Sequence, residues 1–90
     1  MAVYITHRHM VGGEQHEHIA SVKWQNPQTN ETGTSTREVM VDFIANKNGQ
    51  AYVNGNGRAV SVLVVKARPP YIRTYADGVW TNNLLALPLF

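Results

Sequence analysis

Tight-turn dipeptides that separate short apolar segments are the feature that most constrains this chain. Asn54-Gly55 and Asn56-Gly57 lie between two such segments in "AYVNGNGRAV", and Asp77-Gly78 follows "YIRTYA". Asn-Gly and Asp-Gly favour two-residue hairpin turns, because a type I′ turn needs positive φ at both central positions. Gly12-Gly13 provides a further turn after the first apolar segment. This spacing predicts short strands joined by hairpins.

The segment from residue 35 to residue 49 carries a helical pattern instead. Ser35 and Glu38 have the spacing of a capping box, in which each side chain bonds the backbone of the other residue. Asn48-Gly49 tolerates left-handed geometry and is expected to end the helix. The apolar stripe of this helix consists of Val39, Met40, Phe43 and Ile44. We expect about three helical turns lying across the sheet.

The remaining segments complete a small fold. The segment "AVSVLVVKA", residues 59–67, is apolar on both faces beyond Val62 and is expected to be a central strand, ended by Arg68-Pro69-Pro70. Residues 26–34 are polar and predict a loop. The tail is expected to pack onto the core through Leu84, Leu85, Leu87 and Phe90. We predict one α+β domain over residues 1–90, of order ββαβββ, with a small curled antiparallel sheet packed on one helix.

Composition narrows the chemistry and the location. The 90 residues include no cysteine, so disulfides, thiolate nucleophiles and cysteine-based metal sites are excluded. The net charge is +2 with neutral histidines, and the eight basic residues are scattered, unlike those of a nucleic-acid-binding arm. No apolar run approaches the ~18 residues that a membrane span needs. We expect a cytoplasmic protein without a membrane partner.

All four histidines lie in "THRHMVGGEQHEH", residues 6–18, as two His-x-His pairs. His7 and His9 share strand parity with Val3 and Ile5, which predicts that the first pair extends an apolar face. In the second predicted strand, which begins at His16, the residues of one parity are His16, His18, Ala20, Val22 and Trp24, with Ile19 as the exception. A hairpin that sets His7 opposite His18 would also set His9 opposite His16.

This register raises the hypothesis of a metal site. Zinc binds histidine nitrogen in a tetrahedron, and three of the ligands His7, His9, His16 and His18 could converge across such a hairpin. Neighbours two apart on a strand are roughly 6.5–7 Å apart, so all four rings reach one ion only if the sheet curls strongly. The alternative is that two histidines lie at the rim of the core and the others are solvated. Zinc is therefore the cofactor to test.

Longer motifs in both halves of the chain resemble a known family. "HEHIASV", "STREVMVDFI" and above all "RPPYIRTYADGVWTNNLLALP" are similar to the domain of unknown function 3892 family of small bacterial proteins, over nearly the whole chain. The resemblance implies a compact stand-alone domain and marks two regions, "HEHI" and "YIRT-x-ADG", without assigning a role to either. The pair His7 and His9 lies outside these blocks.

The second marked region contains an arginine between two aromatic residues. Arg73 has the strand parity of Tyr71 and Tyr75, an arrangement that can hold an anionic or base-bearing ligand. The alternative is an exposed arginine whose stem covers aromatic surface. Asp77 is explained by its turn, and no nucleophile elbow, phosphate loop or paired-carboxylate motif is present.

These observations predict a non-enzymatic binding or regulatory module. Its partner is an unidentified protein or small molecule, and a homodimer is left open because a small sheet has edge strands. A histidine-ligated zinc protein is the main alternative. Nucleic-acid binding is a further alternative, supported by the nearby Lys66 and Arg68 and opposed by the low net charge. The expected ligand surface is framed by His16, His18, Tyr71, Arg73 and Tyr75.

Overall fold

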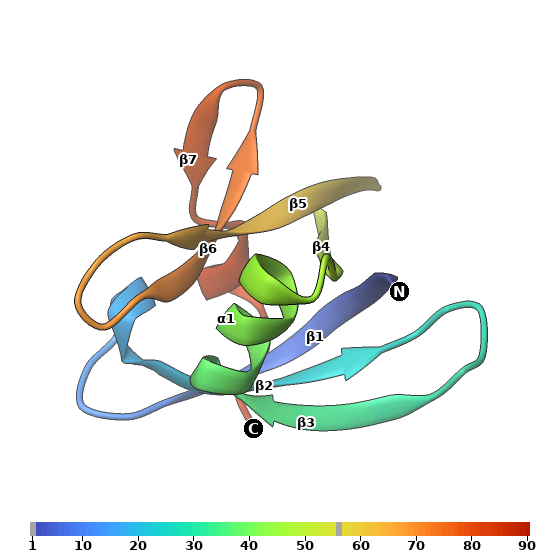
Figure 1. The fold of residues 1–90 in the computed structure, drawn as a ribbon, viewed down its shortest axis with the longest axis horizontal. Helices are drawn as coiled ribbons and strands as arrows, with labels where there is room; N and C mark the ends of the chain where they lie inside the picture. The colour runs from blue at the N-terminus through green and yellow to red at the C-terminus, as the bar shows by residue number, and fades with distance from the viewer. Residues whose placement is uncertain (1, 56) are drawn as a thin grey trace.

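A computed structural model describes residues 2–55 and 57–90. Within them, seven strands form one sheet, and the chain has one α-helix and two short 3₁₀ turns (Figure 1). The α+β class is confirmed. The elements are β1 (Ala2–Met10), η1 (His16–His18), β2 (Ile19–Gln25), β3 (Thr32–Thr36), α1 (Arg37–Asn46), β4 (Gln50–Gly55), β5 (Arg58–Val65), β6 (Tyr71–Ala76), β7 (Val79–Thr81) and η2 (Asn83–Ala86).

The sheet is mixed, with the strand order β3-β2-β1-β4-β5-β6-β7. Residues 2–4 of β1 run parallel to residues 50–52 of β4, and every other strand pair is antiparallel. The expected all-antiparallel sheet and the order ββαβββ are therefore wrong. Residues 32–34, which we expected to be loop, begin β3, and β7 follows the Asp77-Gly78 turn. The parallel pair arises from the connection between β3 and β4. The chain leaves β3, crosses through α1 and enters β4, which lies beside β1 and runs in the same direction.

The sheet curls around α1. The helix contacts β2 and β3 on one side and β5 and β6 on the other, so strands far apart in the sheet share one helix (Figure 1). The buried apolar side chains form one cluster, the hydrophobic core. Removal of their apolar surface from water favours the folded state. The members of the core are Val3, Ile5, Ile19, Val22, Met40, Ala51, Val53, Val62, Ile72 and Leu84.

Two irregularities in the β1–β2 pair overturn the expected histidine register. Ile5 pairs with Trp24 and His7 with Lys23, so Thr6 is an extra residue on β1. A bulge of this kind reverses the alternation of faces, which moves His7 and His9 to the face of Lys23 instead of that of Ile5.

A second irregularity lies at Ala20 of β2, since His9 pairs with Ser21 and Met10 with Ile19. It explains why Ile19, the exception to the predicted alternation, is fully buried beside Val22. The second histidine pair does not belong to this strand, because His16 and His18 form η1.

The helix begins one residue later than the capping-box pattern indicates. Thr36 is the N-cap, and its Oγ1 accepts a hydrogen bond from the Val39 backbone N–H at 3.2 Å. Ser35 remains in β3, where its hydroxyl accepts from Trp24. The expected end is confirmed, since α1 stops at Asn46 and Asn48 has φ of 54°.

The second half of the chain follows the predicted turns. Gly55 pairs with Arg58 across the β4–β5 hairpin and Gly57 has φ of 81°, whereas Asn56 of the second Asn-Gly dipeptide lies outside the described residues. The expected interior position of β5 is confirmed. Asp77 and Gly78 have φ of 53° and 83°, as a type I′ turn requires.

The tail packs onto the core through Leu84, Leu85 and Leu87, as expected. The expectation for Phe90 is wrong, because its ring is exposed and lies against the rings of His7 and His9 instead. Leu84 of η2 is fully buried in the core. Beyond it, the Arg8 backbone donates to Pro88 O at 3.0 Å and accepts from Phe90 N at 3.1 Å. The tail thus lies beside the part of β1 that β4 does not cover.

Candidate functional site

The segment "HEH" forms a single turn that packs against β6. The His18 ring lies against the preceding loop, where an added Cβ on Gly13 would lie 2.6 Å from the ring carbon Cε1. Its Nδ1 faces the Gln15 backbone N–H at 3.4 Å. A glycine at position 13 is therefore what allows the loop to hold this ring in place.

His18 lies at an open groove of about 520 Å³ between η1, the start of α1 and the loop that joins β5 to β6. This volume is within the range of small-ligand sites. The seven residues that line the groove are Glu17, His18, Arg37, Ala67, Arg68, Pro69 and Tyr71. The two regions marked by the resemblance therefore meet in space, through His18 and Tyr71.

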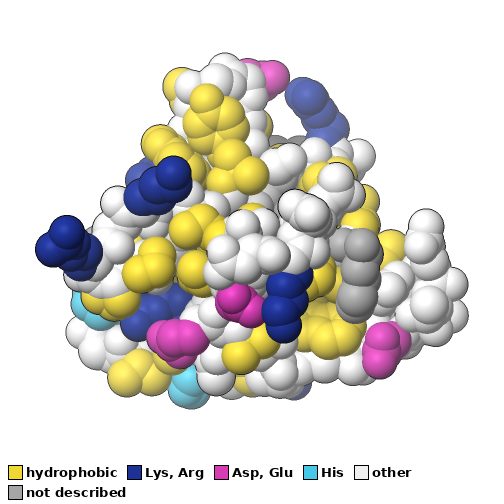
Figure 2. All heavy atoms as spheres, in the orientation of Figure 1, with side chains coloured by type: hydrophobic (Ala, Val, Ile, Leu, Met, Phe, Trp, Pro, Cys, Tyr) yellow, Lys and Arg dark blue, Asp and Glu magenta, His cyan; other side chains and the backbone are white. Residues whose placement is uncertain are grey.

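The groove carries more positive than negative charge. Arg37 donates through Nη1 to the Glu17 carbonyl oxygen, and its Nη2 lies 3.3 Å from Glu38 Oε2. Arg68 is exposed and has no ion-pair partner among residues 2–55 and 57–90. In Figure 2, Lys and Arg side chains gather at the left of the molecule, over the β5–β6 loop, with a histidine below them.

His16 lies beneath this surface rather than on it. The side chain is 5% exposed, and its Nε2 has no hydrogen-bond partner in the described part of the chain. Burial lowers the pKa of His16, the positive charge of Arg73 lowers it further, and Glu17 opposes the shift. A neutral imidazole is therefore favoured at this position.

Arg73 and Tyr75 of the expected ligand surface are engaged elsewhere. Arg73 donates through Nε to Thr81 O and through Nη2 to Asn82 Oδ1, both at 3.1 Å, which ties β6 to the last residue of β7 and to the residue that follows it. Tyr75 packs edge-on against Trp80 at a centroid distance of 5.0 Å, in the β6–β7 hairpin. Of the five expected residues, the structure brings His18 and Tyr71 together in the groove.

The first histidine pair belongs to a different surface. The Phe90 ring lies 6.4 Å from the His7 ring and 5.6 Å from the His9 ring, and Lys23 Nζ is 4.9 Å from its centroid. His9 Nδ1 is 2.7 Å from the Phe90 main-chain oxygen. The described residues include no group of three or more His, Cys, Asp or Glu side chains placed to hold a metal ion. The four predicted zinc ligands are thus split between two places.

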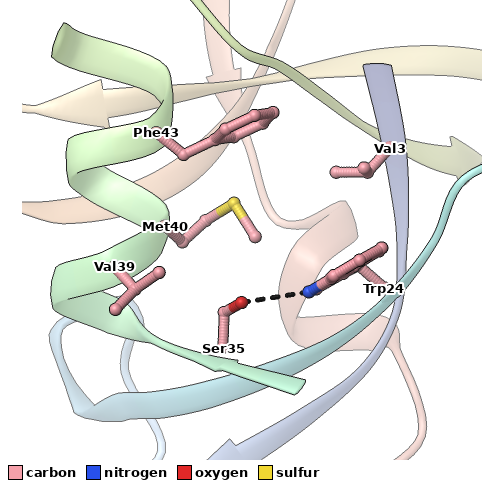
Figure 3. Close-up of a pocket in the computed structure, with 6 residues that line it drawn as sticks. All are labelled: Val3, Trp24, Ser35, Val39, Met40 and Phe43. Atoms are coloured by element: carbon pink, nitrogen blue, oxygen red, sulfur yellow. Dashed lines mark hydrogen bonds between the residues drawn. The ribbon is translucent and has the colours of Figure 1, made fainter. Parts of the chain in front are cut away.

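A second hollow lies between α1 and the first three strands (Figure 3). It has a volume of about 130 Å³, and its walls are Val3, Trp24, Ser35, Val39, Met40 and Phe43. The Trp24 indole N–H donates to Ser35 Oγ at 3.0 Å. With that hydrogen bond made, the hollow presents mainly apolar surface and offers no charged group.

Comparison with known families gives a result over nearly the full chain. The sequence profile described as "Protein of unknown function (DUF3892)" matches residues 3–88. The chain belongs to this family. In this DUF3892 protein, the "HEHI" and "YIRT" segments that carried the resemblance supply His18 and Tyr71 to the groove. No curated protein and no solved structure matches significantly.

Sequence reasoning missed two residues of the groove in this DUF3892 protein. Arg68 was recognised only as the residue before a double proline and as one of the basic residues that support nucleic-acid binding, and Arg37 only as part of the start of a helix. Neither pattern indicates that residue 37 comes to lie beside residues 17 and 18.

Among the described residues, no helix has the length and apolar character needed to cross a membrane.

Proposed function

We propose that this protein is a non-enzymatic binding module whose ligand presents an anionic group to the groove between η1 and the β5–β6 loop. The observation that carries the proposal is the meeting of His18, Arg37, Arg68 and Tyr71, which come from segments far apart in the sequence. Four elements of the chain thus supply one surface.

The charges of the groove support an anionic ligand. Arg37 is held in position by the Glu17 carbonyl oxygen and by Glu38, so part of its guanidinium orientation is fixed before binding. Arginine suits phosphate and carboxylate groups because its planar fork can donate two parallel hydrogen bonds. Arg68 from the β5–β6 loop and His18 from η1 add further donors to the groove.

The neutral surfaces of the groove support a ligand that also has a flat or apolar part. Tyr71, Pro69 and Ala67 supply side chains without formal charge next to Arg68. A tyrosine ring offers a large contact area at little cost in conformational entropy. Among residues 2–55 and 57–90, no Ser, Thr or Cys nucleophile lines the groove, so the lining favours binding over covalent catalysis.

The proposal is tested by titrating ¹⁵N-labelled protein with inorganic phosphate and then with phenyl phosphate, and following backbone and arginine side-chain signals by NMR. We expect shifts centred on His18, Arg37, Arg68 and Tyr71, with phenyl phosphate binding more tightly because it also covers the tyrosine. Arg68→Ala should weaken binding about ten-fold, since a charge-assisted hydrogen bond contributes roughly 1.5–3 kcal/mol when well formed.

Arg58→Ala is the matched control, because Arg58 is exposed in the β4–β5 hairpin and lies outside the groove. It should leave both titrations unchanged. Shifts centred on another surface, or equal losses in the two variants, would contradict the proposal. A stoichiometric zinc adduct lost in His18→Ala would favour the metal alternative instead. Binding of a single-stranded oligonucleotide that weakens steeply with salt would favour the nucleic-acid alternative.

A further inference from the structure

The outer edge of β3 is open to pairing. In the part of the chain that the structure describes, β3 pairs with β2 and ends the sheet on that side. An edge strand presents unpaired N–H and C=O groups, and proteins commonly protect such an edge with charges, proline or a bulge. β3 reads Thr-Gly-Thr-Ser-Thr, contains neither a charged residue nor proline, and pairs with β2 in unbroken register.

The opposite edge of the sheet, unlike the β3 edge, is protected from pairing. β7 has three residues and belongs to the hairpin that projects from the top of the molecule in Figure 1. A very short edge strand offers few hydrogen bonds to a partner. β3, with five residues, is therefore the edge that can accept another strand.

We propose that two copies of this chain associate by antiparallel pairing of their β3 strands about a two-fold axis at Thr34. The strand reads almost the same in both directions, so this register sets Thr32 opposite Thr36 and Gly33 opposite Ser35 of the second copy. A two-fold interface must be self-complementary, and a near-palindromic strand meets that requirement.

The side chains agree with this register. Thr32, Thr34 and Thr36 are exposed, whereas Gly33 and Ser35 are half-buried on the other face. Threonine pairs directly opposite each other across antiparallel strands are favourable. The central residue faces its own copy, so an ionised side chain at position 34 would repel itself; threonine avoids that cost.

The length of β3 sets the strength of this pairing. Five paired residues are fewer than the 20–30 residues a side of a standard interface, so the dimer should dissociate on dilution.

The test is sedimentation velocity of the wild-type chain over about a hundred-fold range of concentration, in which a dimer that obeys mass action grows with concentration. We expect a monomer–dimer equilibrium for the wild type and a monomer throughout for Thr34→Lys. Lys23 lies opposite Thr34 on β2, so circular dichroism must first show that this variant is folded. A wild type that stays monomeric, or a dimer that Thr34→Lys leaves intact, overturns the proposal.

A second experiment combines two variants of opposite charge at position 34, so that the result does not depend on the behaviour of one variant alone. Thr34→Glu mixed with Thr34→Lys should give a mixed dimer, which native mass spectrometry resolves because the two chains differ in mass. Val79→Lys on β7 is the matched control, because Val79 is 60% exposed on the opposite edge, and this variant should dimerise like the wild type. Loss of the dimer in Val79→Lys alone would assign the interface to β7 and overturn the proposal.

Discussion

The contact of Trp24 with Gly33 shows how single residues fix the first half of the sheet. The two residues pair directly across β2 and β3, and the indole ring covers the glycine. The indole N–H of Trp24 also bonds the Ser35 hydroxyl at 3.0 Å, so that the ring is held flat along β3 (Figure 3). A side chain at position 33 would occupy the space of the ring.

We therefore expect Gly33→Ala to destabilise the protein, although alanine is ordinarily the better residue in a strand interior. The added Cβ would lie 2.5 Å from Trp24 Cζ2, which forces the ring to move. Overpacking of this kind costs about 1–3 kcal/mol, measurable as a lower urea midpoint with an unchanged slope. Thr34→Ala, on the exposed face of the same strand, is the control and should change stability by less than about 0.5 kcal/mol. Equal stability of Gly33→Ala and wild type would contradict this account.

The tail is the element that fills the gap in the sheet between β1 and β4. Only residues 2–4 of β1 pair with β4, and the tail lies along the strand near Arg8, where the Arg8 Nε also donates to Leu87 O at 3.1 Å. η2 contacts both β4 and β6, and it places Leu84 in the core without exposed surface. The tail is thus a structural part of the fold.

Leu84→Ala should lower the free energy of unfolding by about 2–5 kcal/mol, because it removes a fully buried side chain and leaves a cavity. Leu89→Ala is the matched control. Leu89 is 63% exposed in the same tail, so its truncation should cost less than about 0.5 kcal/mol. Chemical denaturation of both variants makes the comparison. Similar small losses in the two would show that the tail contributes little to the core.

Stability of the whole molecule should depend on pH through His16. Its pKa is lowered in the folded chain from the ordinary value of 6.5, first by burial and then by Arg73. Just below pH 6.5 the unfolded chain therefore holds a proton that the folded chain does not. Linkage then requires the free energy of unfolding to decrease as the pH falls through this range and to level off above it.

His16→Gln should flatten this dependence just below pH 6.5, because the variant has no titrating group at this position. The readout is the slope of unfolding free energy against pH, which is separate from any uniform loss of stability caused by the substitution. If His16→Gln keeps the wild-type slope, the pH dependence arises from other groups.

The strands β4, β5 and β6, the helix and the packing of the tail through its leucines were predictable because each depends on local signals, whereas β7 was assigned to the tail. Asp77-Gly78 adopts positive φ for reasons internal to the dipeptide, and the stripe that contains Met40 repeats at helical spacing. The extra strand β3 was not predictable, since its polar residues have the composition of a loop and are held by Trp24. The face of the sheet on which His7 and His9 lie was not predictable either. The bulge at Thr6 reverses that face, and the alternation of apolar and polar residues along the strand does not indicate a bulge there.

By itself, the sequence determined the α+β class, the hairpin turns and the absence of cysteine chemistry. It also marked the two segments "HEHI" and "YIRT-x-ADG". Only the tertiary structure decided that these two segments meet, that His16 lies beneath the surface and that Arg37 and Arg68 complete the groove. The physical reason is the separation along the sequence of the residues that interact. Turns and helical stripes depend on neighbouring residues, whereas curling of the sheet around α1 determines which distant side chains share a surface.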